Sequence, residues 1–179
     1  MRTASVGIAI AILAVVVGGC GPTTSEVSSV SKGIPVTDDL VTNQEIQRLP
    51  PGSPGRVLLR WWRAIQYEDL PGYLNLLSNP VRQQRERDNR ARTELPLAAG
   101  SLIPAQPEFT STEITGDTAT LHTQIVTRHN VGTTRYIETR SPQAFRMVKE
   151  AGGWRVGDDL FVEASADAYL RVEQRAAKR

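Results

Sequence analysis

Six residues carry side chains suited to general acid–base catalysis. They are Asp69, Tyr73, His122, Tyr136, Glu138 and Arg140. Such catalysis needs one group that takes up a proton and a second that stabilises the developing negative charge. None of the six falls in a recognisable enzyme motif. We therefore predict no catalytic residue, and neither a cofactor nor a metal site.

Five of these residues also have a structural explanation. Asp69 directly precedes a predicted helix, where a carboxylate commonly caps free backbone N–H groups. His122 lies on the polar side of an alternating stretch, which predicts an outer sheet surface. Tyr136, Glu138 and Arg140 alternate along one strand face and are expected to form a polar cross-strand network.

Composition narrows the chemistry further. The chain has 179 residues, with 21 basic and 19 acidic side chains, two His and a single Cys. One Cys excludes an intramolecular disulfide and a Cys/His zinc cluster. The net charge of +2 argues against a nucleic-acid partner.

The N-terminus reads as an export signal. Arg2 is followed by an uncharged run of small and aliphatic residues at positions 6–19. As a helix this run would rise about 21 Å, which is short against a hydrocarbon core of roughly 30 Å. Cleavage after export is the better interpretation, so residues 1–19 are predicted to be a signal peptide.

The run ends in Val17-Gly18-Gly19-Cys20. This sequence resembles the lipobox of bacterial lipoproteins, with an aliphatic residue three positions before the Cys and small residues between. The resemblance implies that Cys20 becomes the first mature residue and carries acyl chains on the extracytoplasmic face of a membrane. Gly21 follows, rather than the Asp that marks inner-membrane retention in enterobacterial lipoproteins, and an outer membrane stays open as the location. An uncleaved signal anchor is the alternative.

Residues 20–52 are predicted to be the lipidated Cys and a flexible tether, because positions 21–33 are rich in Ser and Thr. The tether would span on the order of 30 Å as a random coil. Within it, Asp39–Gln47 form either a short helix or more tether. Residues 53–179 are predicted to be one domain.

The domain begins with predicted helices. Ser53-Pro54 is a helix start, and the apolar residues that follow, Trp61 and Trp62 among them, share one broad face. The two Trp side chains are expected in the core, with ligand stacking as the alternative. On the opposite face, Arg56, Arg60 and Arg63 are predicted to be solvated.

Further helices are predicted from Asp69 and from Asn79-Pro80. Residues 81–94 are charged nearly all round, with opposite charges four apart, and are expected to form an exposed helix close to anionic lipid headgroups. The prolines and glycine in residues 95–107 predict a loop.

The pattern then alternates, as in strands. The predicted strands are 109–114, 119–128, 133–148 and 154–156, with turns at Gly116-Asp117 and at 150–153. Pro142 predicts a bulge or an edge, and Ser165 is predicted to cap a last helix. The fold class is therefore α+β, with N-terminal helices packed on a curved antiparallel sheet.

The helix at 57–67, Asp69 opening a second helix and the hairpin 145–156 with Gly152-Gly153-Trp154-Arg155-Val156 together resemble the nuclear transport factor 2-like (SnoaL-like, cystatin-like) superfamily. The resemblance covers about residues 54–162. It implies a cone, with a bent sheet around the first long helix and a pocket at the open end. Trp61, Tyr73 and Tyr136 are the candidate pocket residues.

Two functions follow as expectations. The favoured one is a noncatalytic, membrane-anchored module that binds an envelope protein or a small apolar ligand. The alternative is a small isomerase, dehydratase or cyclase that acts on an apolar substrate in the cone, a role implied by enzymes of the superfamily.

Overall fold

The computed structural model describes residues 26–32, 40–130 and 135–178. The signal peptide and Cys20 lie outside these residues. The helices are α1 (Asn43–Arg48), α2 (Pro54–Gln66), α3 (Leu70–Leu76), α4 (Asn79–Asp88), α5 (Ala91–Leu102) and α6 (Leu160–Ala176). The strands are β1 (Glu26–Lys32), β2 (Ala105–Thr115), β3 (Thr118–Asn130), β4 (Arg135–Glu150) and β5 (Gly153–Val156).

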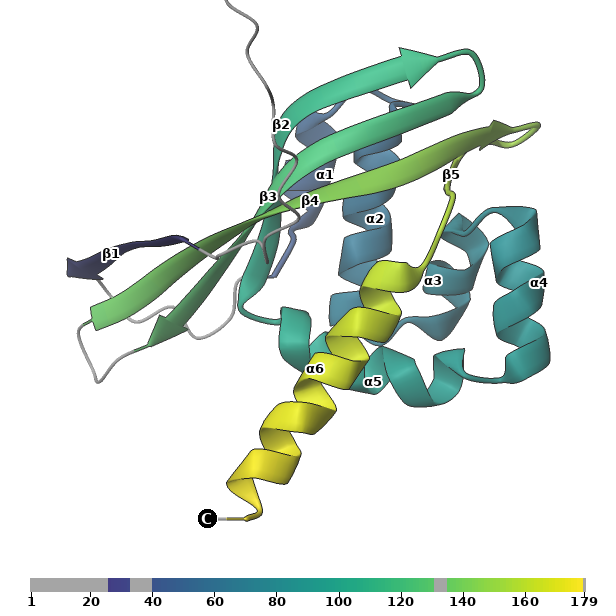
Figure 1. The fold of residues 1–179 in the computed structure, drawn as a ribbon. Helices are drawn as coiled ribbons and strands as arrows, with labels where there is room; N and C mark the ends of the chain where they lie inside the picture. Colours follow the sequence, from purple (N-terminus) through teal and green to yellow (C-terminus); the bar gives the residue numbers. More distant parts are fainter. Residues whose placement is uncertain (1–25, 33–39, 131–134, 179) are drawn as a thin grey trace, which may run out of the picture.

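The fold is α+β, as predicted, with helices packed on an antiparallel sheet. The sheet has the order β1-β4-β3-β2, and β5 pairs with β4. Figure 1 shows its long twisted strands crossing above α2, with α3, α4 and α5 gathered at the far end of α2 and α6 running out to the C-terminus. Among the described residues, no helix combines the length and the hydrophobicity needed to cross a membrane.

The predicted turns of the sheet are confirmed. Gly116 and Gly153 both adopt positive φ, at 59° and 105°, which suits the glycines that end one strand and start the next. Pro142 causes no register shift against β3. It lies between the segments of β4 that pair with β1 and with β5, where this side of β4 is an edge and no N–H is required.

The core is the apolar face of α2 against the sheet. Trp61 and Trp62 are both fully buried, which confirms the core interpretation. The Trp62 ring lies 5.1 Å from that of Phe161 on α6 and 6.2 Å from that of Phe145 on β4, measured between centroids. The Trp61 ring stacks on Tyr73 of α3 at 6.2 Å. Aromatic rings therefore fill the space between α2, the sheet and α6.

Two segments predicted as tether are ordered parts of the fold. Val41 and Ile46 are buried in the core, and α1 has a capping box in which Thr42 and Glu45 bond each other's backbone. β1 pairs antiparallel with β4 over Arg135–Arg140. The polar composition of residues 21–33 misled the prediction, because a strand at a sheet edge gains its hydrogen bonds from the partner strand's backbone.

The predicted helix over residues 79–94 is wrong in its length, and the predicted loop at 95–107 is wrong. The chain reverses at Asn89, whose φ is 52°, so that α4 ends at Asp88 and α5 begins at Ala91. Pro96 is tolerated inside α5 near its start. Of the charge pairs predicted four residues apart, Arg82–Glu86 and Arg90–Glu94 form. Asn89 separates Glu86 from Arg90 and Asp88 from Arg92, so these two predicted pairs do not lie on one helix.

The last helix also begins earlier than predicted. α6 starts at Leu160 after Asp159, and Ser165 is a buried residue within it. Gly157 and Asp158 follow the end of β5. Asp159 contacts Tyr73 of α3 and Arg85 of α4, and a local sequence pattern does not reveal such distant contacts.

One buried amide ties three segments to the end of α2. The side-chain oxygen of Gln66 accepts a bond from the backbone N–H of Val41 at 2.9 Å. Its nitrogen donates to the carbonyls of Leu102 at 2.9 Å and of Ala105 at 3.1 Å. The indole N–H of Trp62 also donates to the carbonyl oxygen of Ala105, at 3.1 Å.

Replacing this amide should destabilise the whole domain. We expect Gln66→Leu to lower the free energy of unfolding by about 2–4 kcal/mol, because it leaves a buried N–H and two buried carbonyls short of a partner. Gln83→Leu on the exposed side of α4 is the matched control and should change it by less than about 0.5 kcal/mol. Urea denaturation of both variants measures the difference, and equal midpoints would contradict the assigned role.

Candidate functional site

The candidate pocket residues do not meet in one cavity. Trp61 and Tyr73 are fully buried between packed rings, and the half-buried Tyr136 lies on β4 opposite Asn130, away from α2. None of the three lines either of the two hollows found among the described residues. The interior of the predicted cone is a packed core at this position.

Tyr73 belongs to a buried ionic cluster at the helical end of the molecule. Its hydroxyl donates to the Asp159 carboxylate, which also contacts the Arg85 guanidinium. Arg85 further contacts Glu94 and, at 3.1 Å, Glu163. The cluster thus joins α3, α4, α5 and the start of α6. Arg85 is only 5% exposed, so the prediction that residues 81–94 form a wholly exposed helix is wrong here.

Burial has the largest effect on the pKa values of Asp159 and Tyr73 in this cluster. It raises the pKa of Asp159 to about 6, although Tyr73 and Arg85 act in the opposite direction. Burial also raises the pKa of Tyr73, and the Asp159 charge raises it further. A Tyr–Asp pair can act as acid and base, but here Arg85 occupies the carboxylate and the Trp61 ring covers the phenol. The cluster is therefore suited to holding helices together.

The remaining acid–base candidates lie apart from it. Asp69 caps α3 by accepting the Gly72 N–H at 3.0 Å, as predicted. His122 is partly exposed, and its Nε2 lies 3.4 Å from Glu113. It lines a small hollow of about 370 Å³ between β2, β3 and β4.

The predicted polar network on β4 forms in part. Glu138 accepts from Arg140 at 2.9 Å and from Arg128 of β3 at 3.0 Å. Burial alone would raise the pKa of Glu138, but these two guanidinium groups hold it below its usual value. Arg140 also pairs with Glu108 of β2 at 2.6 Å. The network crosses three strands, and its contacts run through Arg128 and Glu108 rather than Tyr136.

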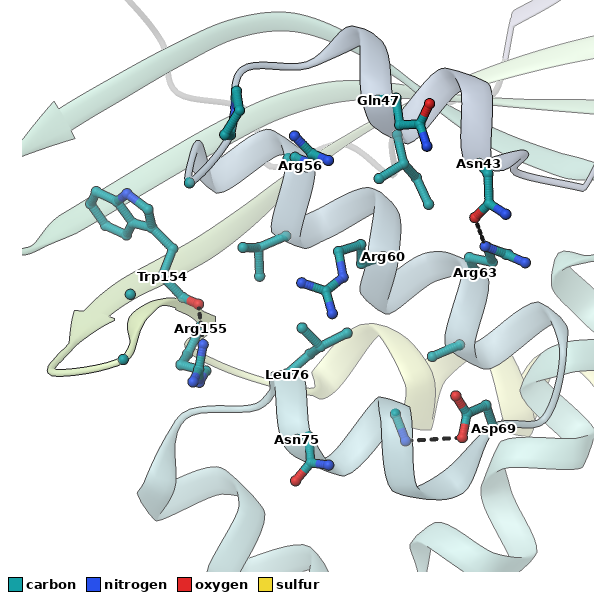
Figure 2. Close-up of a pocket in the computed structure, with 18 of the residues that line it drawn as sticks. Asn43, Gln47, Arg56, Arg60, Arg63, Asp69, Asn75, Leu76, Trp154 and Arg155 are labelled. Atoms are coloured by element: carbon teal, nitrogen blue, oxygen red, sulfur yellow. Dashed lines mark hydrogen bonds between the residues drawn. The ribbon is translucent and has the colours of Figure 1, made fainter.

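The larger hollow is a groove of about 1100 Å³ on the other side of α2. Figure 2 shows α2 along its floor, with α1 on one side, α3 on the other and the β4–β5 turn at one end. Its polar lining residues are Asn43, Gln47, Arg56, Arg60, Arg63, Asp69, Asn75 and Arg155. We call this hollow the α2 groove.

Four arginines give the α2 groove a positive charge. Arg56, Arg60 and Arg63 follow one another at about one helical turn along α2, and Arg155 faces them from β5. In the described part of the chain, none of the four has a carboxylate within ion-pair distance. Arg63 bonds the Asn43 amide and lies 5.0 Å over the Tyr67 ring. Arg155 donates to the Trp154 carbonyl at 2.9 Å.

The sequence predicts a solvated arginine face, and in the structure Arg60 is exposed while Arg56 and Arg63 are half-buried. The groove around this face could not be predicted, because α1, expected only as one of two alternatives, and the β4–β5 turn build its walls. Arg155 was read only as part of a hairpin motif. No group of three or more His, Cys, Asp or Glu side chains suited to a metal occurs among the described residues.

The ionic cluster predicts a specific pH dependence. The pKa of Asp159 rises from 3.8 when unfolded to about 6 when folded, so the folded protein binds the extra proton between these values. Stability from this group is therefore present at low pH and falls as the pH rises through about 6. Asp159→Asn keeps the shape and removes the titration.

We expect the free energy of unfolding of Asp159→Asn, relative to that of the native protein, to increase by about 2 kcal/mol from about pH 4.5 to about pH 7.5. Asp167→Asn, on the exposed side of α6, is the control variant for the loss of one carboxylate. Denaturant titrations across this range provide the measurement. If this difference for Asp159→Asn stays constant or decreases as the pH rises, folding does not raise the pKa of the Asp159 carboxyl group.

Comparison with known proteins does not assign the chain to a family. No protein-family model and no curated protein matches the sequence. Two solved structures show distant likeness. One is a variant of Rv3472, a function-unknown protein from Mycobacterium tuberculosis, with 16% identity and a TM-score of 0.45 over 68% of this chain and 86% of that one. The other is RPA3114, a SEC-C motif containing protein from Rhodopseudomonas palustris, with 13% identity and a TM-score of 0.43 over 63% and 80%.

Proposed function

We propose that this protein is a bacterial lipoprotein, anchored by acyl chains on Cys20 to the extracytoplasmic face of a membrane, whose α+β domain is a noncatalytic interaction module. The observation that carries the interaction role is the contrast between the two faces of α2. Aromatic rings occupy the interior face, and the α2 groove lies along the other.

The packed interior favours binding over catalysis. An isomerase, dehydratase or cyclase of the superfamily that the sequence resembles would need an acid–base pair facing a substrate cavity. Here Tyr73 and Asp159 are joined to Arg85 inside the core, and His122 lies on the sheet. The same packing favours an envelope protein over a small apolar ligand, because aromatic rings fill the interior and the larger hollow has four arginines among its polar and apolar lining residues.

The anchor has a direct test. We expect Cys20→Ala to lose metabolic labelling by palmitate and to leave the membrane fraction, because acyl chains supply the membrane affinity. Fractionation and labelling of intact cells measure both. Since the chain has one Cys, no other thiol can substitute. Continued labelling of the variant would refute lipidation at this residue.

The interaction role is tested by crosslinking in intact cells. A photoreactive residue is placed at Gln47, on the rim of the α2 groove, and in a second variant at Thr112, an exposed position on β2. We expect a discrete adduct with one envelope protein from at least one position, and its loss when Cys20→Ala is added. The absence of any discrete adduct from both positions would contradict an interaction module.

A further inference from the structure

We propose that the α2 groove binds an extended acidic peptide segment of a partner protein, with its carboxylates on Arg56, Arg60 and Arg63. This inference rests on the proposed interaction role and specifies its ligand. The groove is large for a single anion, since pockets for whole small ligands span roughly 300–1000 Å³. At about 1100 Å³ it fits several residues of a chain.

The spacing of the arginines fits a chain of charges. On an α-helix, Arg56 and Arg60 are separated by a rise of about 6 Å, and Arg60 and Arg63 by about 4.5 Å. Side chains on one face of an extended peptide repeat at about 6.6 Å. Alternating acidic residues of an extended segment can therefore meet successive arginines along the floor of the groove.

The arginines are available for such a ligand. Arg56 and Arg60 form no ion pair with another described residue, unlike Arg82, Arg85 and Arg140, which are paired with carboxylates. A guanidinium group binds a carboxylate through two parallel N–H bonds. Arg56 and Arg63 are half-buried, which strengthens their attraction for a carboxylate relative to a fully exposed charge, whereas Arg60 is exposed.

The rest of the lining favours peptide over phosphate. Asn43, Gln47 and Asn75 offer both donors and acceptors, which match the N–H and C=O groups of a peptide backbone. A phosphate oxygen only accepts hydrogen bonds, so a phosphate ligand would leave the amide oxygens of these side chains without a donor. Ile46, Val57 and Leu76 add apolar contact between the polar groups.

Binding is measured with the full-length protein in nonionic detergent. The probe is a fluorescent peptide of about eight residues in which Glu alternates with Gly, and the control peptide carries Gln in place of Glu. The groove variant is Arg56→Gln with Arg60→Gln. The matched control variant is Arg87→Gln with Arg92→Gln, which removes the same charge from exposed positions on α4 and α5.

We expect the Glu peptide to bind the native protein, and the groove variant to lose at least about tenfold in affinity, while the matched control loses less than about twofold. Unchanged circular dichroism of the groove variant confirms folding. Equal losses in both variants would show nonspecific attraction and overturn the proposal. Stronger binding of tripolyphosphate than of the peptide, or arginine-dependent binding only to vesicles with anionic lipid, would also overturn it in favour of those ligands. These results leave the crosslinking test of the interaction role unaffected.

Discussion

The adjacent burial of Trp61 and Trp62 is the constraint on which the rest of the structure depends. Neighbouring residues on an α-helix point about 100° apart, so burying both indoles requires cover on two sides of α2. The sheet and α6 cover one ring, and Tyr73 of α3 stacks on the other. What is left of the circumference of α2 is a narrow strip. That strip carries Arg56, Arg60 and Arg63, and α1, α3 and the β4–β5 turn rise on its flanks to make it the floor of a groove.

Much of the fold could be predicted because its signals are local. Ser53 accepts the Arg56 N–H as a cap, Asp69 caps α3, and the glycines at the two hairpin turns adopt positive φ. The errors arise where distant contacts decide. α5 forms through Pro96, in a stretch whose prolines predict a loop. α6 starts at Leu160, directly after Asp159, whose carboxylate contacts Tyr73 and Arg85 far back in the sequence.

The candidate site could be predicted from the sequence less completely than the fold. The arginine face of α2 was visible as a periodic pattern, but a helical wheel cannot distinguish open solvent from a groove whose walls come from other segments. Arg85 shows the reverse problem. Among many exposed charges on α4, nothing local distinguishes the one that is buried with Glu94, Asp159 and Glu163. Tyr73 is predicted as a pocket residue, whereas the structure buries it against Asp159, a partner 86 positions away in the sequence.

The pairing of β1 with β4 has a consequence for how the domain would sit at a membrane. Only residues 21–25 separate Cys20 from the first residue of β1. Even fully extended, this linker spans about 20 Å. With lipid on Cys20, the domain would therefore be held by the edge of its sheet at close range to the headgroups, and its freedom to rotate would be small. One side of the domain would then face the membrane and the opposite side would face away from it. A partner protein would bind at a fixed distance from the bilayer.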